Sequence, residues 1–450
     1  MTRRTALVAL LAGTLLAPLN SSMVAVAVAP IQQHFTLSLA TTTWMVTVFY
    51  LTASVCQPLL GRVADQIGPR RLFTAGLLVA TAASAMAALA PSFAVLVVCR
   101  GLQAVGISAA FPCAMVVLRR DGGAAAGRLS MIATVNTTAG AVGPVLGGLL
   151  TSWGGWQSIF WVNLPILATA LVLAWRALGP DDRRPGSVLR CLDPIGVALF
   201  AAAAIGLLDV VLTGFSLLGA LVLGLGAGGF LWWERRAAEP FVDLRALGGV
   251  RSVLGIFVLF NLVYYGAFYG LPPWLQSTLG YDAAAAGLLI MPIAVTSVVA
   301  TVLGSPIMRR LGVGRTLVAA GVVLLAGVAL IAVFGPDTPA WLVVADGVVL
   351  GVPYGLGNLG LQRLMYERAP AEMSGVVGGL FQSARYAGAI LAVGLAGATA
   401  PPEPCAPPDI RVLAIAMSAV AVAVVGLLIR DLRHPGRALS RETVGAGRQS

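Results

Sequence analysis

The feature that most constrains this chain is a succession of long apolar segments with almost no charge. A helix needs about 20 mostly apolar residues to cross the roughly 30 Å of hydrocarbon in a bilayer. Fourteen segments of the sequence have about that length and character, and the sequence therefore predicts an all-α polytopic membrane protein with fourteen transmembrane helices. They are residues 6–27, 43–60, 72–90, 93–117, 129–151, 159–178, 194–213, 215–233, 252–271, 285–307, 316–334, 340–361, 374–396 and 410–429.

Composition argues against a water-soluble protein. Of the 450 residues, 58% are hydrophobic and 10% are charged, whereas a soluble domain is about one-quarter charged. A single soluble core cannot bury so much apolar surface, so a soluble enzyme or nucleic-acid-binding domain is disfavoured.

Residues 194–213 and 215–233 are separated by so few residues that they could instead form one re-entrant pair, which would leave the number of spans even.

The arginines give the orientation of these segments. All 29 basic residues are arginine, and the net charge is +11. If the N-terminus is cytoplasmic, every arginine falls in an inner loop or terminus except Arg100 and Arg385, which lie within apolar segments, and Arg411, at an outer edge. Positive residues near spans stay on the cytoplasmic side. We therefore expect a multi-pass protein of the inner (cytoplasmic) membrane with both termini cytoplasmic, whose basic loops face membrane lipid and not nucleic acid.

The N-terminal segment has some features of a signal peptide. Arg3, Arg4 and the apolar run after them resemble one, but the run exceeds 20 residues, which favours a retained first span.

The five cysteines and two histidines show no spacing typical of a metal site. A membrane enzyme would need a clustered acid, histidine or cysteine site. None is recognisable, so we expect no enzyme activity, no cofactor and no metal.

Several motifs occur in the order found in one transporter family. The loop Gly61–Arg71 reads GRVADQIGPRR, and residues 304–315 form a second glycine-rich basic loop, as expected of a transporter built from repeats. The first loop resembles the signature between the second and third spans of the major facilitator superfamily. Further stretches that resemble this family, and in particular its fourteen-span drug:proton antiporter branch, are residues 44–51, 100–106, 143–148, 156–165 and 233–240.

This resemblance implies a fold and a function. The fold would be two six-helix bundles around a central cavity, formed by residues 1–178 and 252–430, with two inserted helices within 179–251 and a cytoplasmic tail at 431–450. The function would be secondary active export of amphipathic small molecules, such as drugs or antibiotics, by proton antiport with alternating access. A dedicated exporter or importer of a single metabolite on the same fold is the alternative.

The motifs also suggest which residues control conformational change. Gly61 and Gly68 permit tight turns, and Asp65 could pair with Arg70 or Arg71 to hold the inner face in one state. In the fifth span, small residues permit close helix packing and a proline can kink the helix. The residues expected to act there are Gly143, Pro144, Gly147 and Gly148.

Ionisable residues inside spans are costly and are functional candidates by default. Asp346 is the first candidate for proton coupling, because proton binding and substrate binding can compete for a buried acid. Arg100 and Arg385 are expected to assist it, whereas Asp209 is expected to be structural. Relatives often carry an aspartate in the first span where this chain has Asn20, which cannot titrate.

Polar and aromatic residues on the predicted cavity helices are candidates for substrate binding. Asn261, Tyr265 and Tyr269 recur at intervals of four residues and form one stripe on a helix. Such a stripe suits a substrate with rings and a few polar groups. The other residues expected to contact substrate are Asn20, Phe268, Tyr354 and Asn358.

Overall fold

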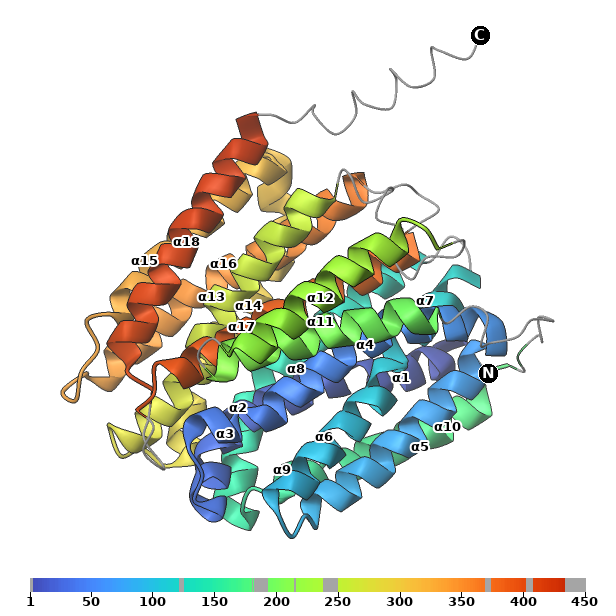
Figure 1. The fold of residues 1–450 in the computed structure, drawn as a ribbon, viewed down its shortest axis with the longest axis horizontal. Coiled ribbons are helices and arrows are strands. Elements are labelled where there is room, and N and C mark those ends of the chain that lie inside the picture. Colours follow the sequence, from blue (N-terminus) through green and yellow to red (C-terminus); the bar gives the residue numbers. More distant parts are fainter. Residues whose placement is uncertain are drawn as a thin grey trace.

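The computed structural model describes residues 3–120, 125–179, 181, 193–213, 216–237, 250–368, 374–401 and 408–433, and no strand occurs among them. Nearly all of these residues are helical (Figure 1). The helices are α1 (Arg3–Thr14), α2 (Leu16–Phe35), α3 (Leu39–Thr42), α4 (Trp44–Ile67), α5 (Pro69–Ala88), α6 (Phe93–Ser108), α7 (Ala110–Arg120), α8 (Ala125–Gly154), α9 (Ser158–Trp161), α10 (Asn163–Ala177), α11 (Pro194–Thr213), α12 (Leu217–Glu234), α13 (Arg251–Ser277), α14 (Ala283–Leu311), α15 (Val313–Ile331), α16 (Ala340–Arg368), α17 (Ser374–Ala398) and α18 (Ile410–Arg433).

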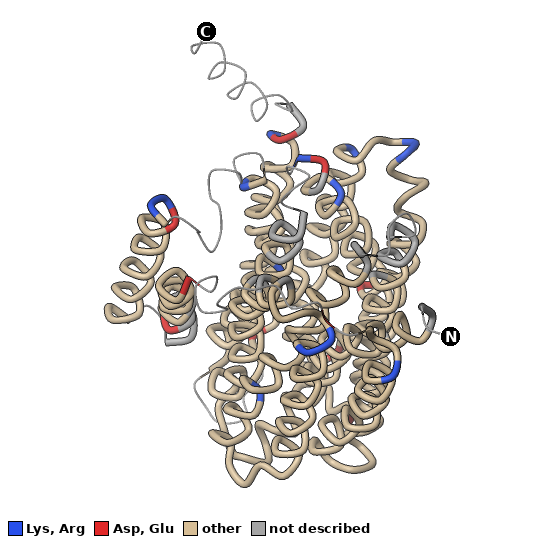
Figure 2. Tube along the Cα trace, turned by 90° about the vertical axis from the view of Figure 1, so that its right-hand side faces the viewer, with Lys and Arg blue, Asp and Glu red and all other residues tan. Residues whose placement is uncertain are grey.

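Eleven helical stretches in the described part of the chain are long and apolar enough to cross a membrane. Some predicted spans are made of two consecutive helices. The backbone hydrogen bonds Leu15 N–H to Leu11 and Leu19 N–H to Leu15, for example, carry the first span from α1 into α2. The three remaining predicted segments lie in α8, α11 and α17, and the total of fourteen stays a prediction. Figure 2 shows that the chain carries few charges along most of its length.

The helices pack into a first group, a second group and a separate pair. In the first group α2 packs on α8, α5 on α6 and α10, and α4 on α6. In the second group α13 packs on α17 and α18, and α16 lies between α14 and α15. The two groups meet where α8 packs on α14, α4 on α17 and α2 on α13.

The pair α11 and α12 forms an antiparallel hairpin. Gly206 of α11 lies against the backbone of Leu223, and Gly226 of α12 lies against the backbone of Ala203. Each helix is a separate rod of 20 or 18 residues. Through α11 the pair contacts α17 and α4, so it covers one seam between the two groups (Figure 1).

Candidate functional site

A central cavity lies between the two helix groups. It holds about 1260 Å³ of non-atom space, a volume that includes open solvent, and is lined from one side by α1, α2, α4, α6, α7 and α8 and from the other by α13, α14, α16 and α17. Serine, threonine, asparagine and glutamine side chains alternate with aromatic rings around it. A pocket of this kind can bury an organic molecule while a few polar groups fix its orientation.

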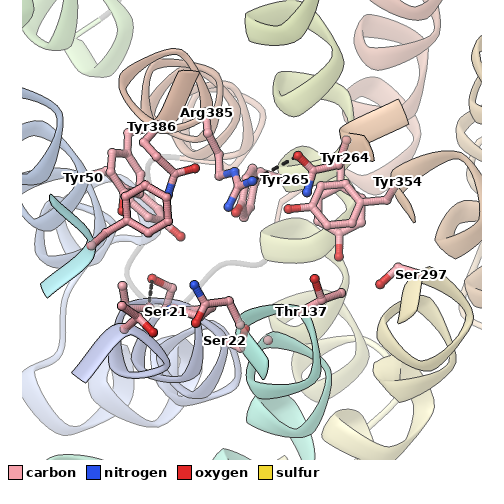
Figure 3. Close-up of a pocket in the computed structure, with 18 of the residues that line it drawn as sticks. Ser21, Ser22, Tyr50, Thr137, Tyr264, Tyr265, Ser297, Tyr354, Arg385 and Tyr386 are labelled. Carbon is pink, nitrogen blue, oxygen red and sulfur yellow. Dashed lines mark hydrogen bonds between the residues drawn. The ribbon is translucent and has the colours of Figure 1, made fainter. Parts of the chain in front are cut away.

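Tyrosines form two walls of the cavity that are joined by Tyr265 (Figure 3). Tyr50 of α4 stacks on Tyr386 of α17 with ring centroids 5.2 Å apart, and this pair joins the two helix groups. Tyr264 of α13 stacks on Tyr354 of α16 at 3.5 Å, and the Tyr265 ring centroid is 5.3 Å from that of Tyr264 and 6.0 Å from that of Tyr50. The site can therefore hold an aromatic guest against these rings.

Arg385 projects from α17 between these walls (Figure 3). Its Nη2 donates a hydrogen bond of 3.0 Å to the side-chain carbonyl oxygen of Asn358. Its Nε is buried and has no hydrogen-bond partner among the described residues. The described residues that line the cavity include no aspartate, glutamate, lysine or histidine, so Arg385 gives the cavity its formal charge.

Arg100 of α6 is also buried, with 1% of its surface exposed, but it does not line the cavity. Its Nη1 donates to Asn20 Oδ1 at 2.6 Å and to Gln103 Oε1 at 2.5 Å, and its Nε donates to the Met45 carbonyl at 3.3 Å. The guanidinium lies 4.3 Å from the ring centroid of Phe49. Neutral groups thus hold this charge in place inside the first helix group.

Asp346 of α16 lies within the second helix group. Its exposed fraction is 0%, and neither carboxylate oxygen has a hydrogen-bond partner in the described part of the protein. It is eight residues before Tyr354, which places it about 12 Å further along the helix axis. An ionised carboxylate is costly in such a place, so the neutral acid is the form that this environment accommodates.

One end of the cavity is closed by close contact between the two helix groups. A Cβ atom on Gly148 of α8 would lie 2.5 Å from the carbonyl oxygen of Ala283, and one on Gly287 of α14 would meet the carbonyl of Pro144. Gly148 and Gly287 therefore let the two backbones touch. By the predicted topology this crossing lies on the outer side.

Hydrogen bonds between the two groups reinforce this closure. The hydroxyl of Tyr269 shares a hydrogen bond of 2.8 Å with that of Tyr50 and is 3.1 Å from the Ser21 carbonyl, to which it donates. Gln276 Nε2 donates to the Val26 carbonyl at 3.2 Å. The predicted gating residues Gly143 and Gly147 lie instead within the first group, against Ser22 and Met23 of α2.

The first turn of α5 makes a carboxylate contact that the sequence motif does not reveal. Asp181 accepts backbone hydrogen bonds from Arg70 at 3.1 Å and from Arg71 at 2.8 Å. Gly68 has φ +93° and lies so close to the Asp181 side chain that a Cβ atom would collide with it. Gly61 has more space, 3.9 Å from Pro112, and the side chain of Asp65 is outside the described part of the chain.

The structure brings together part of the predicted binding set. Tyr265, Phe268, Tyr354 and Asn358 line the cavity, as does Arg385. The other predicted residues have different surroundings: Asn20 accepts from Arg100, Asn261 donates to the Phe257 carbonyl, and Tyr269 bonds Tyr50.

Three further tyrosines line the cavity that the predicted binding set does not contain. They are Tyr50, Tyr264 and Tyr386. Tyr264 is next to a predicted cavity residue, and Tyr386 directly follows Arg385, so position along the chain could have indicated both.

Comparison with known proteins places these features in context. Residues 10–393 match the family model described as Major Facilitator Superfamily. The uncharacterized MFS-type transporter YwoD of Bacillus subtilis (strain 168) is 35% identical over 407 residues, which are 86% of this chain and 87% of that protein. The tetracenomycin C resistance and export protein of Streptomyces glaucescens is 28% identical, over 87% of this chain and 74% of that protein.

Other relatives are named for multidrug or antibiotic resistance. Among solved structures, a bacterial homolog of the human lysosomal transporter Spinster, in an inward-facing and unoccupied conformation, superposes with a TM-score of 0.65. That likeness covers 95% of each chain at 17% identity and shows the fold alone.

Proposed function

Because this chain belongs to the Major Facilitator Superfamily, we propose that it exports amphipathic small molecules, such as drugs or antibiotics, across the cytoplasmic membrane in exchange for protons. The observation that carries this proposal is an aromatic cavity between two helix groups, combined with a buried acid that has no hydrogen-bond partner among the described residues. Relatives that are named for antibiotic export and resistance support the choice of substrate.

Alternating access would follow from relative motion of two bundles, residues 1–178 and 252–430, with α11 and α12 as the insert. Fourteen spans with both termini cytoplasmic would place the arginine-rich loops next to inner-leaflet lipid. In this topology the Gly148–Gly287 crossing closes the outer side, and Gln57, Phe111 and Gln362 line the part of the cavity nearer the cytoplasm. The structure would then correspond to an inward-facing state.

Asp346 would carry the proton. It is buried without a hydrogen-bond partner among the described residues, so losing its proton requires a change in its surroundings such as hydration or the approach of a positive group. Motion of α16, which contains Pro353 and also carries the cavity residues Tyr354 and Asn358, would provide such a change. Arg100 would hold the wall of the first bundle in position during this motion.

The test is transport in everted membrane vesicles with an imposed pH gradient. We expect an acidic interior to drive uptake of a substrate dye, and Asp346→Asn to abolish this response while the protein remains folded. Asp337→Asn is the matched control, because Asp337 is an exposed acid in the loop before α16. A wild-type protein that ignores the gradient would contradict antiport, and a fully responsive Asp346→Asn variant would contradict the choice of proton carrier.

A further inference from the structure

The cavity has an uneven charge balance. Arg385 is cationic, and no acidic side chain is present among the described residues that line the cavity with it. Membrane interiors make an unbalanced charge expensive, and intramembrane arginines usually pair with an acid or a carbonyl group. A negatively charged partner would therefore lower the free-energy cost of the positive charge on Arg385.

The donors of Arg385 are largely unused. A guanidinium has five N–H donors and no acceptor, and in the described structure Arg385 makes one hydrogen bond, to Asn358. Its Nε is buried and unpartnered. Arginine binds planar carboxylates through pairs of N–H groups, and Arg385 is among the residues that line the cavity.

The chain itself does not provide the missing negative charge within the described residues around the cavity. Asp346 is on the same helix as Asn358 but twelve residues earlier, about 18 Å along the axis, and it is outside the lining. Arg100, in the other helix group, adds a second positive charge that only neutral groups contact. An anion that enters from outside would satisfy both the unused donors and the charge.

The surroundings of Arg385 specify the rest of such a ligand. Figure 3 shows its guanidinium between the Tyr50–Tyr386 pair and the group formed by Tyr264, Tyr265 and Tyr354, with hydroxyls of Ser21, Ser22 and Thr137 opposite. Flat rings pack against tyrosine faces and edges. The Ser21 hydroxyl already donates to the Ala17 carbonyl, whereas the Ser22 hydroxyl can donate to a further oxygen of the ligand.

We propose that the substrates are aromatic organic anions, with the negative group bound by Arg385 and the rings packed against the tyrosine walls. The proposal depends on the proposed function only in taking this cavity as the transport site. It makes Arg385 a substrate-binding residue, and it separates this chain from exporters that would select cationic drugs.

The test compares binding of three naphthalene probes to the purified full-length protein in lipid nanodiscs by titration calorimetry. The probes are 2-naphthoate, the neutral 2-naphthamide and the cationic (2-naphthylmethyl)trimethylammonium. We expect naphthoate to bind roughly tenfold to hundredfold tighter than the amide, as for a hydrogen bond to a charged group, and the cation to bind most weakly. Equal binding of naphthoate and naphthamide, or a preference for the cation, would overturn the proposal.

Variants assign the effect to Arg385. Arg385→Gln should remove the preference for naphthoate over naphthamide, and Arg385→Lys should keep part of it. Arg363→Gln, which removes an exposed charge paired with Glu367, should leave all three affinities unchanged. If Arg385→Gln does not fold, the probe ranking in the wild type and in Arg385→Lys still decides. A naphthoate preference that survives in folded Arg385→Gln would contradict the assignment.

This experiment and the vesicle experiment fail separately. Probe binding needs no proton gradient, so a protein that prefers naphthoate but ignores the pH gradient would refute antiport and leave the anion site standing. A protein that responds to the gradient but does not discriminate between naphthoate and naphthamide would refute the anion site and leave antiport standing.

Discussion

Arg100 and Arg385 are both arginines inside apolar helices, one in each helix group, and the structure surrounds them differently. Arg100 donates to two side-chain oxygens and a backbone carbonyl, and it lies near the ring of Phe49. Within the described part of the chain, Arg385 makes one hydrogen bond, and it lines the cavity. The comparison indicates that an intramembrane arginine can be structural or available for binding, and that its hydrogen bonds distinguish the two.

The largest expected difference between the two arginines is in folding. Arg100→Leu would leave the side-chain oxygens of Asn20 and Gln103 buried without this donor, at about 1–3 kcal/mol for each unsatisfied group. Arg385→Leu would leave only Asn358 without its donor, and that side chain lines the cavity, where water can replace it. We expect Arg100→Leu to lose most folded protein in size-exclusion chromatography and thermal unfolding, whereas Arg385→Leu stays folded. Equal losses in the two variants would remove the distinction.

The distinction could not have been made from the sequence. The sequence predicts that both residues are intramembrane, because each is flanked by apolar residues. It also identifies Tyr265 from its helical spacing, and the family resemblance identifies Tyr354 and Asn358 through the helix that carries them. It does not reveal that Asn20 meets Arg100 across 80 positions. Partners so distant in sequence depend on how helices pack, and apolar patterning constrains packing only loosely.

The same limit explains other features that the sequence left open. Asp181 contacts Arg70 and Arg71 from a loop more than 100 positions away, and no motif links them. Gly287 was not singled out, because it lies alone among alanines and leucines and becomes significant only when Pro144 of another helix touches it. The helices were thus predictable from local hydropathy, whereas contacts between helices were not.

The second expected effect is electrical. Exchange of one inward proton for one outward monoanion moves two charges, whereas exchange for a neutral molecule moves one. Each charge contributes about 2.3 kcal/mol per 100 mV. At a membrane potential of about 100 mV, the concentration gradient reached by naphthoate should therefore exceed that of naphthamide by a factor of about 50. Proteoliposomes with a potassium diffusion potential and valinomycin measure this. The same voltage dependence for both probes would mean that Arg385 does not carry an anion through the cycle.

The third expected effect comes from a substitution in the contact between α8 and α14, which leaves both arginines unchanged. Gly287→Ala places a methyl group against the backbone carbonyl of Pro144, which cannot move aside as a flexible side chain would. We expect the closed crossing to open more often. A cysteine at Ser22→Cys, in a background without native cysteines, should then react about tenfold faster with an impermeant maleimide applied to intact cells.

The control for this variant is Gly255→Ala. Gly255 is in α13 and has nothing within 4 Å of a built Cβ atom, so its substitution should leave the labelling rate unchanged. If Gly287→Ala labels no faster than this control, the α8–α14 crossing is not the outer closure, and the relation between cavity and state must be revised.

The smallest expected effect comes from Asn20→Asp, which gives Arg100 the acid that Arg385 lacks. Asn20 Oδ1 is already 2.6 Å from Arg100, and its Nδ2 is buried without a partner. A carboxylate there replaces an unsatisfied donor by a second acceptor, so we expect about 1–2 kcal/mol of added stability, since charge-assisted hydrogen bonds gain about that much. Thermal unfolding of the purified variant measures it. Because Asn20 does not line the cavity, the affinity for naphthoate should change less than about threefold, a difference of under 1 kcal/mol. A large loss of naphthoate affinity would show that the two arginines act as one positive field on the substrate, and the separation between a structural and a binding arginine would fail.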